Sequence, residues 1–372
     1  MEHLAAQRTG RGARKALSDM PQNLNETYKR VLARLHTDSP DRILMQRTLL
    51  WLSFATRPLH LLELSDAVVL EDDDMSLDSD SRLHLPEVLI DLAQGLIDYD
   101  RDSMLVSLGH SSIKTFLTSA WILKSSVADF ALEESKAHKT VMRKCLTYLC
   151  FSEFKNGCDQ SALVCETRTN RYPLLAYAAH NWALHARNVN DEDWQHIRAF
   201  FHTIALPNGG NYGWWLQCTA GYLPHQIVQQ TSPLYYAASF GYTSLVKAIL
   251  DFDQSVNLEK PGGRQGSTAL QVACFRKQQE ASKLLVQAGA NPCSLDGSPV
   301  EGGLSAFFWA KANGWEDIMD LMTKSAVARG VQVQQRVYKA GSVAYALDVQ
   351  KTVVQALEDA SSAASSGGVS QS

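Results

Sequence analysis

A motif that recurs at a nearly constant interval constrains the fold of this chain more than any other feature. Residues 232–241, 268–277 and 305–314 read SPLYYAASFG, TALQVACFRK and SAFFWAKANG, at intervals of 36 and 37 residues. Each segment precedes a second apolar pattern, LVKAIL, ASKLLVQAGAN or DIMDLM, so each unit is predicted to be a pair of amphipathic helices. One pair cannot bury both of its faces, and stacking of neighbouring pairs must supply the core.

The spacing is typical of ankyrin repeats, which carry T-P-L-H-x-A at the first helix in a period near 33 residues. Small residues at Ala237, Ala273 and Ala310 allow close approach of the first helices. The excess over 33 residues falls between Asp253 and Thr268 and between Gly289 and Ser305, in the finger loops at one edge of the stack. We therefore predict three ankyrin units over residues 231–326.

One position departs from the ankyrin pattern. The histidine of T-P-L-H is replaced by Tyr235, Gln271 and Phe308 in the three units, which puts the usual hydrogen bonding at the helix start in doubt.

The rest of the chain reads as mainly helical. A hairpin is expected where two short apolar runs, Leu96–Tyr99 and Met104–Leu108, flank the turn DRDS. Helices followed by a hairpin and another helix are the order of a winged helix. The expected domains are a linker helix (1–40), a winged-helix-like domain (41–126), a helical connector (127–230), the ankyrin stack (231–326) and a weakly structured to disordered tail (327–372).

Composition excludes several classes of protein. The net charge of −4 gives no reason to expect nucleic acid or an anionic membrane as partner. No apolar run approaches the length of about 20 residues that spans a bilayer, and no secretory signal opens the chain. Seven scattered cysteines without a C-x-x-C pair favour reduced thiols over disulfides or a zinc site. We expect a cytoplasmic protein without cofactor or metal.

Local features that could suggest chemistry are better explained structurally. His110 beside Ser111 and Ser112 lacks the G-x-S-x-G elbow, and a serine there is a natural helix cap. The stretch from Glu63 to Asp102 contains 13 acidic and two basic residues. This excess of negative charge opposes DNA binding by a winged helix. The EDDD run at 71–74 lacks the alternating ligands and glycine of an EF-hand. No catalytic residue is predicted, and the chain is not expected to be an enzyme.

Several ordered segments resemble the fungal NACHT–ankyrin proteins, members of the STAND class of signal-transducing NTPases. RKALSDMPQNLNETYKRVL is similar to the stretch after their NTPase core. LLWLSFATRPLHLLELSDAV, GHSSIKTFLTS, AHKTVMRKCLTYL and YPLLAYAAHNW resemble their winged-helix and connector segments. The resemblance covers residues 13–325. No segment fits G-x-x-x-x-G-K-[ST], so it implies the C-terminal portion of such a protein without the nucleotide-binding core.

The leading hypothesis is a non-enzymatic protein–protein interaction module, the regulatory or sensor portion of a NACHT-type signalling protein. One alternative is the regulatory part of an NTPase whose catalytic domain lies on a longer isoform or a separate chain. The other is a winged-helix DNA-binding regulator, which the acidic surface disfavours. A protein partner is expected on the concave face and finger loops, with no nucleic acid, membrane or small-molecule substrate. The predicted contact residues are Ser239, Phe240, Glu259, Lys260, Arg264, Phe275 and Arg276.

Overall fold

The structure of the protein is a computed structural model. It describes residues 24–36, 39–157, 171–220, 223–298, 303–330, 343–344, 346–351, 354–355 and 359. Most of the expected linker before Leu24 and most of the expected tail lie outside these residues. The chain divides into two compact units, one formed by residues 1–68 and 83–137 and the other by residues 69–82 and 138–372.

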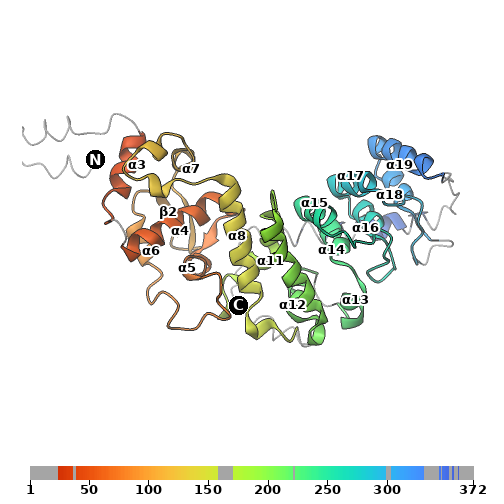
Figure 1. The fold of residues 1–372 in the computed structure, drawn as a ribbon, viewed down its shortest axis with the longest axis horizontal. Coiled ribbons are helices and arrows are strands. Elements are labelled where there is room, and N and C mark those ends of the chain that lie inside the picture. Colours follow the sequence, from red (N-terminus) through yellow and green to blue (C-terminus); the bar gives the residue numbers. More distant parts are fainter. Residues whose placement is uncertain are drawn as a thin grey trace, which may run out of the picture. The chain divides into compact units, whose positions relative to one another are not determined.

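The first unit is helical with a small antiparallel sheet (Figure 1). Its described elements are α3 (Leu24–Leu32), α4 (Pro40–Phe54), β1 (Leu59–His60), α5 (Leu61–Val69), α6 (Val88–Leu92), β2 (Ile97–Asp100), β3 (Leu105–Leu108) and α7 (Ser111–Leu117). The expected hairpin is present, with Ile97 of β2 opposite Leu108 of β3. Strand β1 pairs with the other edge of β3, so the sheet order is β1-β3-β2.

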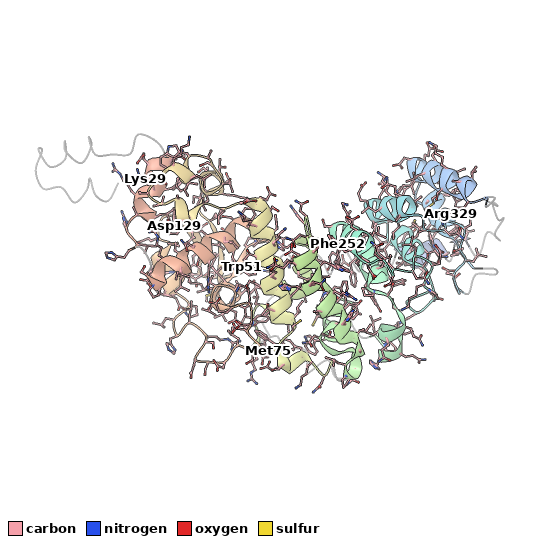
Figure 2. All side chains as sticks on the ribbon, viewed as in Figure 1. Lys29, Trp51, Met75, Asp129, Phe252 and Arg329 are labelled. Carbon is pink, nitrogen blue, oxygen red and sulfur yellow. The ribbon has the colours of Figure 1, made fainter. Side chains whose placement is uncertain are left out.

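Helix α3 packs into the core of this unit. Tyr28 and Leu32 on one face of α3 are buried beside Phe116 of α7, and the Tyr28 hydroxyl lies 2.8 Å from the Ser112 Oγ. Arg42, buried on α4, donates two hydrogen bonds of 2.7 Å to the Asp129 carboxylate. Asp129 is labelled in Figure 2. The segment expected to be a linker helix is therefore part of the same core as the sheet.

The second unit opens with helices that carry a dense aromatic core. These are α8 (Glu134–Leu149), α10 (Leu175–Asn181), α11 (Asp191–His202), α12 (Gly210–Ala220) and α13 (His225–Gln230), joined in places by short 3₁₀ turns. Helix α11 begins with a capping box between Asn190 and Asp193. The fully buried Asp193 carboxylate also forms ion pairs with Arg143 at 2.6 Å and with Lys139 at 3.1 Å. These ion pairs connect α8 to the start of α11.

The repeats follow as three helix pairs within the described residues. Their first helices are α14 (Pro233–Ser239), α16 (Ala269–Phe275) and α18 (Ala306–Ala312), and their second helices are α15 (Thr243–Phe252), α17 (Gln279–Ala288) and α19 (Glu316–Ala328). Figure 1 shows the two sets as two layers. Ala237, Ala273 and Ala310 are each fully buried, as close packing of the first helices requires.

The turn inside each pair needs a backbone in the left-handed region. Gly241 and Gly314 occupy this position with φ of 71°, where glycine is favoured because it lacks a Cβ. The middle repeat has Lys277 at the equivalent place with φ of 59°. The structure thus keeps the turn of the repeat even where the sequence lacks glycine.

The N-terminal end of the stack packs on the aromatic core of the preceding helices. The Trp215 ring on α12 lies 6.2 Å from that of Phe240, and Phe252 on α15, labelled in Figure 2, stacks on Trp194 with centroids 6.0 Å apart. The Tyr242 hydroxyl donates a 3.2 Å hydrogen bond to the His180 carbonyl. Helix α12, which carries Trp215, therefore packs against the first of the three helix pairs.

The described part of the tail is not all irregular. Residues 343–344 and 346–351 are helical, and Ala346 and Gln350 in this segment are buried. The Ala/Ser/Gly-rich end of the chain lies outside the described residues.

Candidate partner-binding groove

Each first helix of the stack starts at a hydroxyl cap. Ser232, Thr268 and Ser305 accept hydrogen bonds from the backbone N–H three residues later, at 3.3, 3.3 and 3.2 Å. Such caps satisfy donors that a helix start otherwise leaves unpaired. The helix-start hydrogen bonding, doubtful on the sequence because the repeat histidine is missing, is therefore present in all three units.

Gln271, at the position of the ankyrin histidine, forms hydrogen bonds both within its own helix start and to the loop before the next repeat. Its side-chain Nε2 donates to the carbonyls of Ser294 at 2.6 Å and Leu304 at 2.9 Å, and its Oε1 accepts from the Thr268 N–H at 2.6 Å. Gln271 is 1% exposed. One amide thus caps its own helix and fastens the loop that leads to the next repeat.

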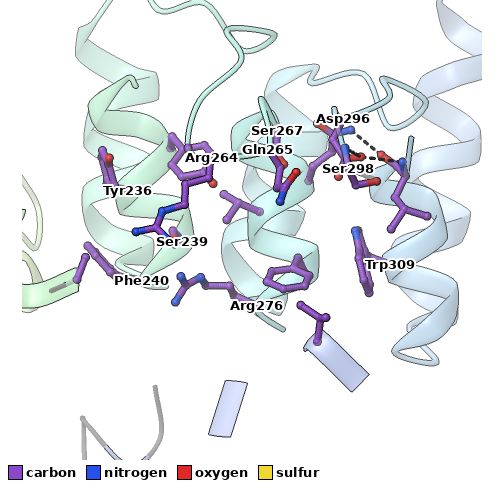
Figure 3. A pocket seen from close by; sticks show the side chains of 18 of the residues that line it. Tyr236, Ser239, Phe240, Arg264, Gln265, Ser267, Arg276, Asp296, Ser298 and Trp309 are labelled. Atoms are coloured by element: carbon purple, nitrogen blue, oxygen red, sulfur yellow. Dashed lines mark hydrogen bonds between the residues drawn. The ribbon is translucent and has the colours of Figure 1, made fainter. Parts of the chain in front are cut away.

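A groove of about 460 Å³ runs across the first helices of the stack and the finger loops. Five of the seven predicted contact residues line it: Ser239, Phe240, Arg264, Phe275 and Arg276. Figure 3 shows Arg264 and Arg276 on the side of the groove that carries Ser239 and Phe240, with Asp296 and Trp309 toward its other end. Residues as far apart in the sequence as Ser239 and Trp309 therefore meet on one surface.

The remaining two predicted residues do not line the groove. Glu259 is exposed, and its carboxylate accepts the Asn291 N–H and the Ser294 hydroxyl, both at 2.7 Å. It holds the two finger loops together. Lys260 beside it is exposed on the first finger loop. Neither position has the enclosure of the groove.

The groove has an aromatic floor. Phe275 and Trp309 lie edge to face with centroids 5.0 Å apart, and Tyr236 stacks on Phe240 at 6.2 Å. Tyr236 and Trp309 were not among the predicted contacts. They occupy equivalent positions of the first and third units, one residue after the missing histidine, so the repeat alignment carried the signal needed to find them.

The groove is also cationic. The pKa of the Arg276 guanidinium is lowered by burial, with the nearby Tyr235 acting in the opposite direction, and its Nε has no hydrogen-bond partner among the described residues. Arginine nonetheless keeps its charge at neutral pH. Among the described residues that line the groove, Asp296 supplies the one carboxylate, and it accepts from the backbone N–H of Ser298 at 3.1 Å and of Leu304 at 2.8 Å. A ligand offering acceptor atoms to Arg276 fits this arrangement.

A second polar cluster lies away from the groove, among the connector helices. His185 Nδ1 is 2.8 Å from His138 Nδ1, and His185 Nε2 is 2.9 Å from the Tyr177 hydroxyl. Burial, the neighbouring His138 and Arg187 lower the pKa of His185 to about 3. His185 is fully buried and held by ring partners, so the cluster is a packing element of the core.

The described residues offer little for metal or thiol chemistry. Within those ranges, no three His, Cys, Asp or Glu side chains gather to hold a metal ion. Five cysteines are free thiols there, and burial raises the pKa of Cys145 and Cys274 above the usual value. No helix in the described part of the chain is long and apolar enough to cross a membrane.

Comparison with known proteins identifies the repeats. The family described as "Ankyrin repeats (3 copies)" matches residues 214–296. The match begins inside α12, ahead of the predicted start at residue 231, and ends before α18 and α19. The structure gives this last pair the same arrangement as the pairs before it.

A curated relative matches a larger part of the chain. It is the azaphilone pigments biosynthesis cluster protein L of Monascus ruber, 26% identical over 299 residues. The match covers 74% of this chain but only 61% of the relative's length. No solved structure matches. The family match thus identifies residues 214–296 as ankyrin repeats. Ankyrin repeats generally hold other proteins on their concave face and loops.

Proposed function

We propose that the chain is a non-enzymatic interaction module that binds a partner protein in the groove formed by α14, α16 and α18. The observation that carries the proposal is the convergence of Phe240, Phe275, Arg264 and Arg276 on one enclosed surface. Aromatic residues and arginine dominate the energetics of protein interfaces because they combine a large contact area with directed polar contacts. Ankyrin repeats present such surfaces on a rigid stack.

The wider role in this proposal is regulation or sensing in a cytoplasmic NACHT-type signalling protein. It is supported by the ordered segments that resemble that class, which run from the region after the NTPase core into the repeats. The Monascus relative, whose name refers to a pigment biosynthesis cluster, is longer than the matched region. The nucleotide-dependent activity would then belong to a part of the signalling protein outside this sequence.

The groove can be tested by reversing its charge without disturbing the core. Arg264→Glu combined with Arg276→Glu changes two groove cations, whereas Lys324→Glu makes the same kind of change on the exposed face of α19. A partner identified by crosslinking from a photoreactive side chain at position 264 is then titrated by calorimetry. We expect the double variant to bind at least tenfold more weakly and Lys324→Glu to bind like the wild type. Equal affinity of all three proteins would contradict the groove assignment.

The proposal that the chain is not an enzyme has its own test. Titration of the full chain with ATP and with GTP is expected to release no binding heat. Saturable binding of either nucleotide would refute the non-enzymatic proposal and favour a chain that takes part directly in the NTPase.

A further inference from the structure

The groove already holds a helix of the same chain at one edge. Ala346 and Val349, from the helical segment 346–351, are among the residues that line it. Ala346 is 5% exposed and Gln350 is 3% exposed, Val349 lies at the rim of the groove with 36% exposed, and Asp348 and Lys351 face solvent. Positions i, i+3 and i+4 of a helix share one face, so this segment presents Ala346, Val349 and Gln350 to the repeats.

Gln350 makes a specific connection to two repeats. Its Nε2 donates to the Phe275 carbonyl at 2.8 Å and to the Asn313 Oδ1 at 3.0 Å. Phe275 is the last residue of α16, and the last carbonyls of a helix have no partner within the helix itself. Asn313 in turn donates its Nδ2 to the Cys274 carbonyl at 2.8 Å. The glutamine therefore completes a hydrogen-bond network at the junction between the second and third units.

The contact is specific but small. The buried side chains of the segment are an alanine and a glutamine, and alanine removes little apolar surface from water. Most of the groove beyond it, including Arg264, Arg276 and Phe240, still encloses open space. A segment held in this way depends on its high effective concentration as part of the same chain, and an occupant with a larger apolar face can replace it.

We propose that residues 346–351 are a built-in competitor of the groove, and that the partner is an amphipathic helix of the same pattern. This inference rests on the proposed function of the groove. The partner helix would carry a small residue, an aliphatic residue three positions later and a glutamine or asparagine at the fourth. That amide takes the place of Gln350 on the Phe275 carbonyl and Asn313. An acidic residue elsewhere on the helix would meet Arg264 and Arg276.

The competition can be measured without knowing the partner. The probe is a fluorescein-labelled peptide with the sequence of residues 343–359, titrated into the full-length chain and followed by anisotropy. In the chain, Gln350→Glu replaces the donating amide by an acceptor that faces the Phe275 carbonyl, and Ala346→Asp places a charge in the buried contact. Lys351→Ala, on the exposed face of the same helix, is the matched control.

We expect the peptide to bind the Gln350→Glu and Ala346→Asp chains at least tenfold more tightly than the wild type, because their own segment no longer occupies the groove. Lys351→Ala should match the wild type, and a peptide carrying Gln350→Glu should bind none of the proteins. Equal binding to all chains, or no binding to any of them, would overturn the inference. Charge reversal at Arg264 and Arg276 tests the groove as a partner site, independently of the peptide experiment. If those variants lose partner binding while the peptide binds all chains equally, the competitor inference is wrong and the proposed function stands.

Discussion

Gln271 offers the sharpest test of how the repeats are held together. Gln271→Glu keeps the shape of the side chain and the acceptor that receives the Thr268 N–H, but replaces the Nε2 donor by an oxygen. That oxygen would face the carbonyls of Ser294 and Leu304, at the 2.6 and 2.9 Å that now separate them from Nε2. A protonated glutamic acid can restore one of the two hydrogen bonds, whereas an ionised one restores neither.

The expected loss follows from burial. Leaving a buried polar group without its partner costs about 1–3 kcal/mol, and one to two such groups arise here, so we expect the free energy of unfolding to fall by about 3 kcal/mol. In a unit of this size that loss corresponds to a decrease in Tm of roughly 6–12 °C. Burial should also raise the pKa of the new carboxyl, so the loss should grow as the pH rises above the ordinary glutamate pKa.

Urea unfolding followed by circular dichroism at pH 5 and pH 7.5 measures both effects. Gln265→Glu is the control because Gln265 lines the groove but is exposed, and a surface change of this kind is worth less than about 0.5 kcal/mol. If Gln271→Glu were as stable as Gln265→Glu at both pH values, Gln271 would not fasten the repeats in the way argued here.

Three further predictions concern the second unit. Lys277→Gly should raise the free energy of unfolding by about 0.5–1 kcal/mol in urea titrations, because glycine removes the left-handed strain at this turn, whereas Gly314→Lys should lower it. Asp193→Asn should cost about 3 kcal/mol by the same measurement, since it leaves two cations beside a neutral buried group. The pKa of His185 is lowered to about 3 in the folded state, so its stabilising contribution is complete above pH 6.5 and declines as the pH falls from 6.5 toward 3. His185→Gln should therefore flatten this part of the curve of unfolding free energy against pH. An unchanged slope would contradict the view that His185 is buried in its neutral form.

The repeats could be predicted because their signal is periodic. Leu234, Leu270 and Phe307 recur at one position of the pattern, and each becomes a buried first-helix residue. The same alignment predicts that Phe240, Phe275 and Arg276 share one surface, and all three line the groove. Period and position, rather than individual residue types, carried this information.

Other parts of the fold depend on contacts that leave no local signature. Strand β1 has two residues, Leu59 and His60, which is too short for any alternation of apolar and polar side chains to be recognised. The helix at 346–351 has a narrow apolar face, and its position is set by Gln350 meeting carbonyl and amide groups of distant repeats. Asp296 likewise lines the groove because of how its finger loop folds, which no local pattern in the sequence predicts.

The ring contacts of Trp215 with Phe240 and of Trp194 with Phe252 have a consequence for how the array could change in evolution. Repeat proteins commonly lengthen by duplicating a unit, and an inserted copy must offer its neighbours the surfaces that they lost. A copy placed ahead of α14 would separate these aromatic pairs and the bond from Tyr242 to the His180 carbonyl. We therefore expect homologues of different length to gain or lose units after the α14–α15 pair, while the junction around Trp215 keeps a constant spacing.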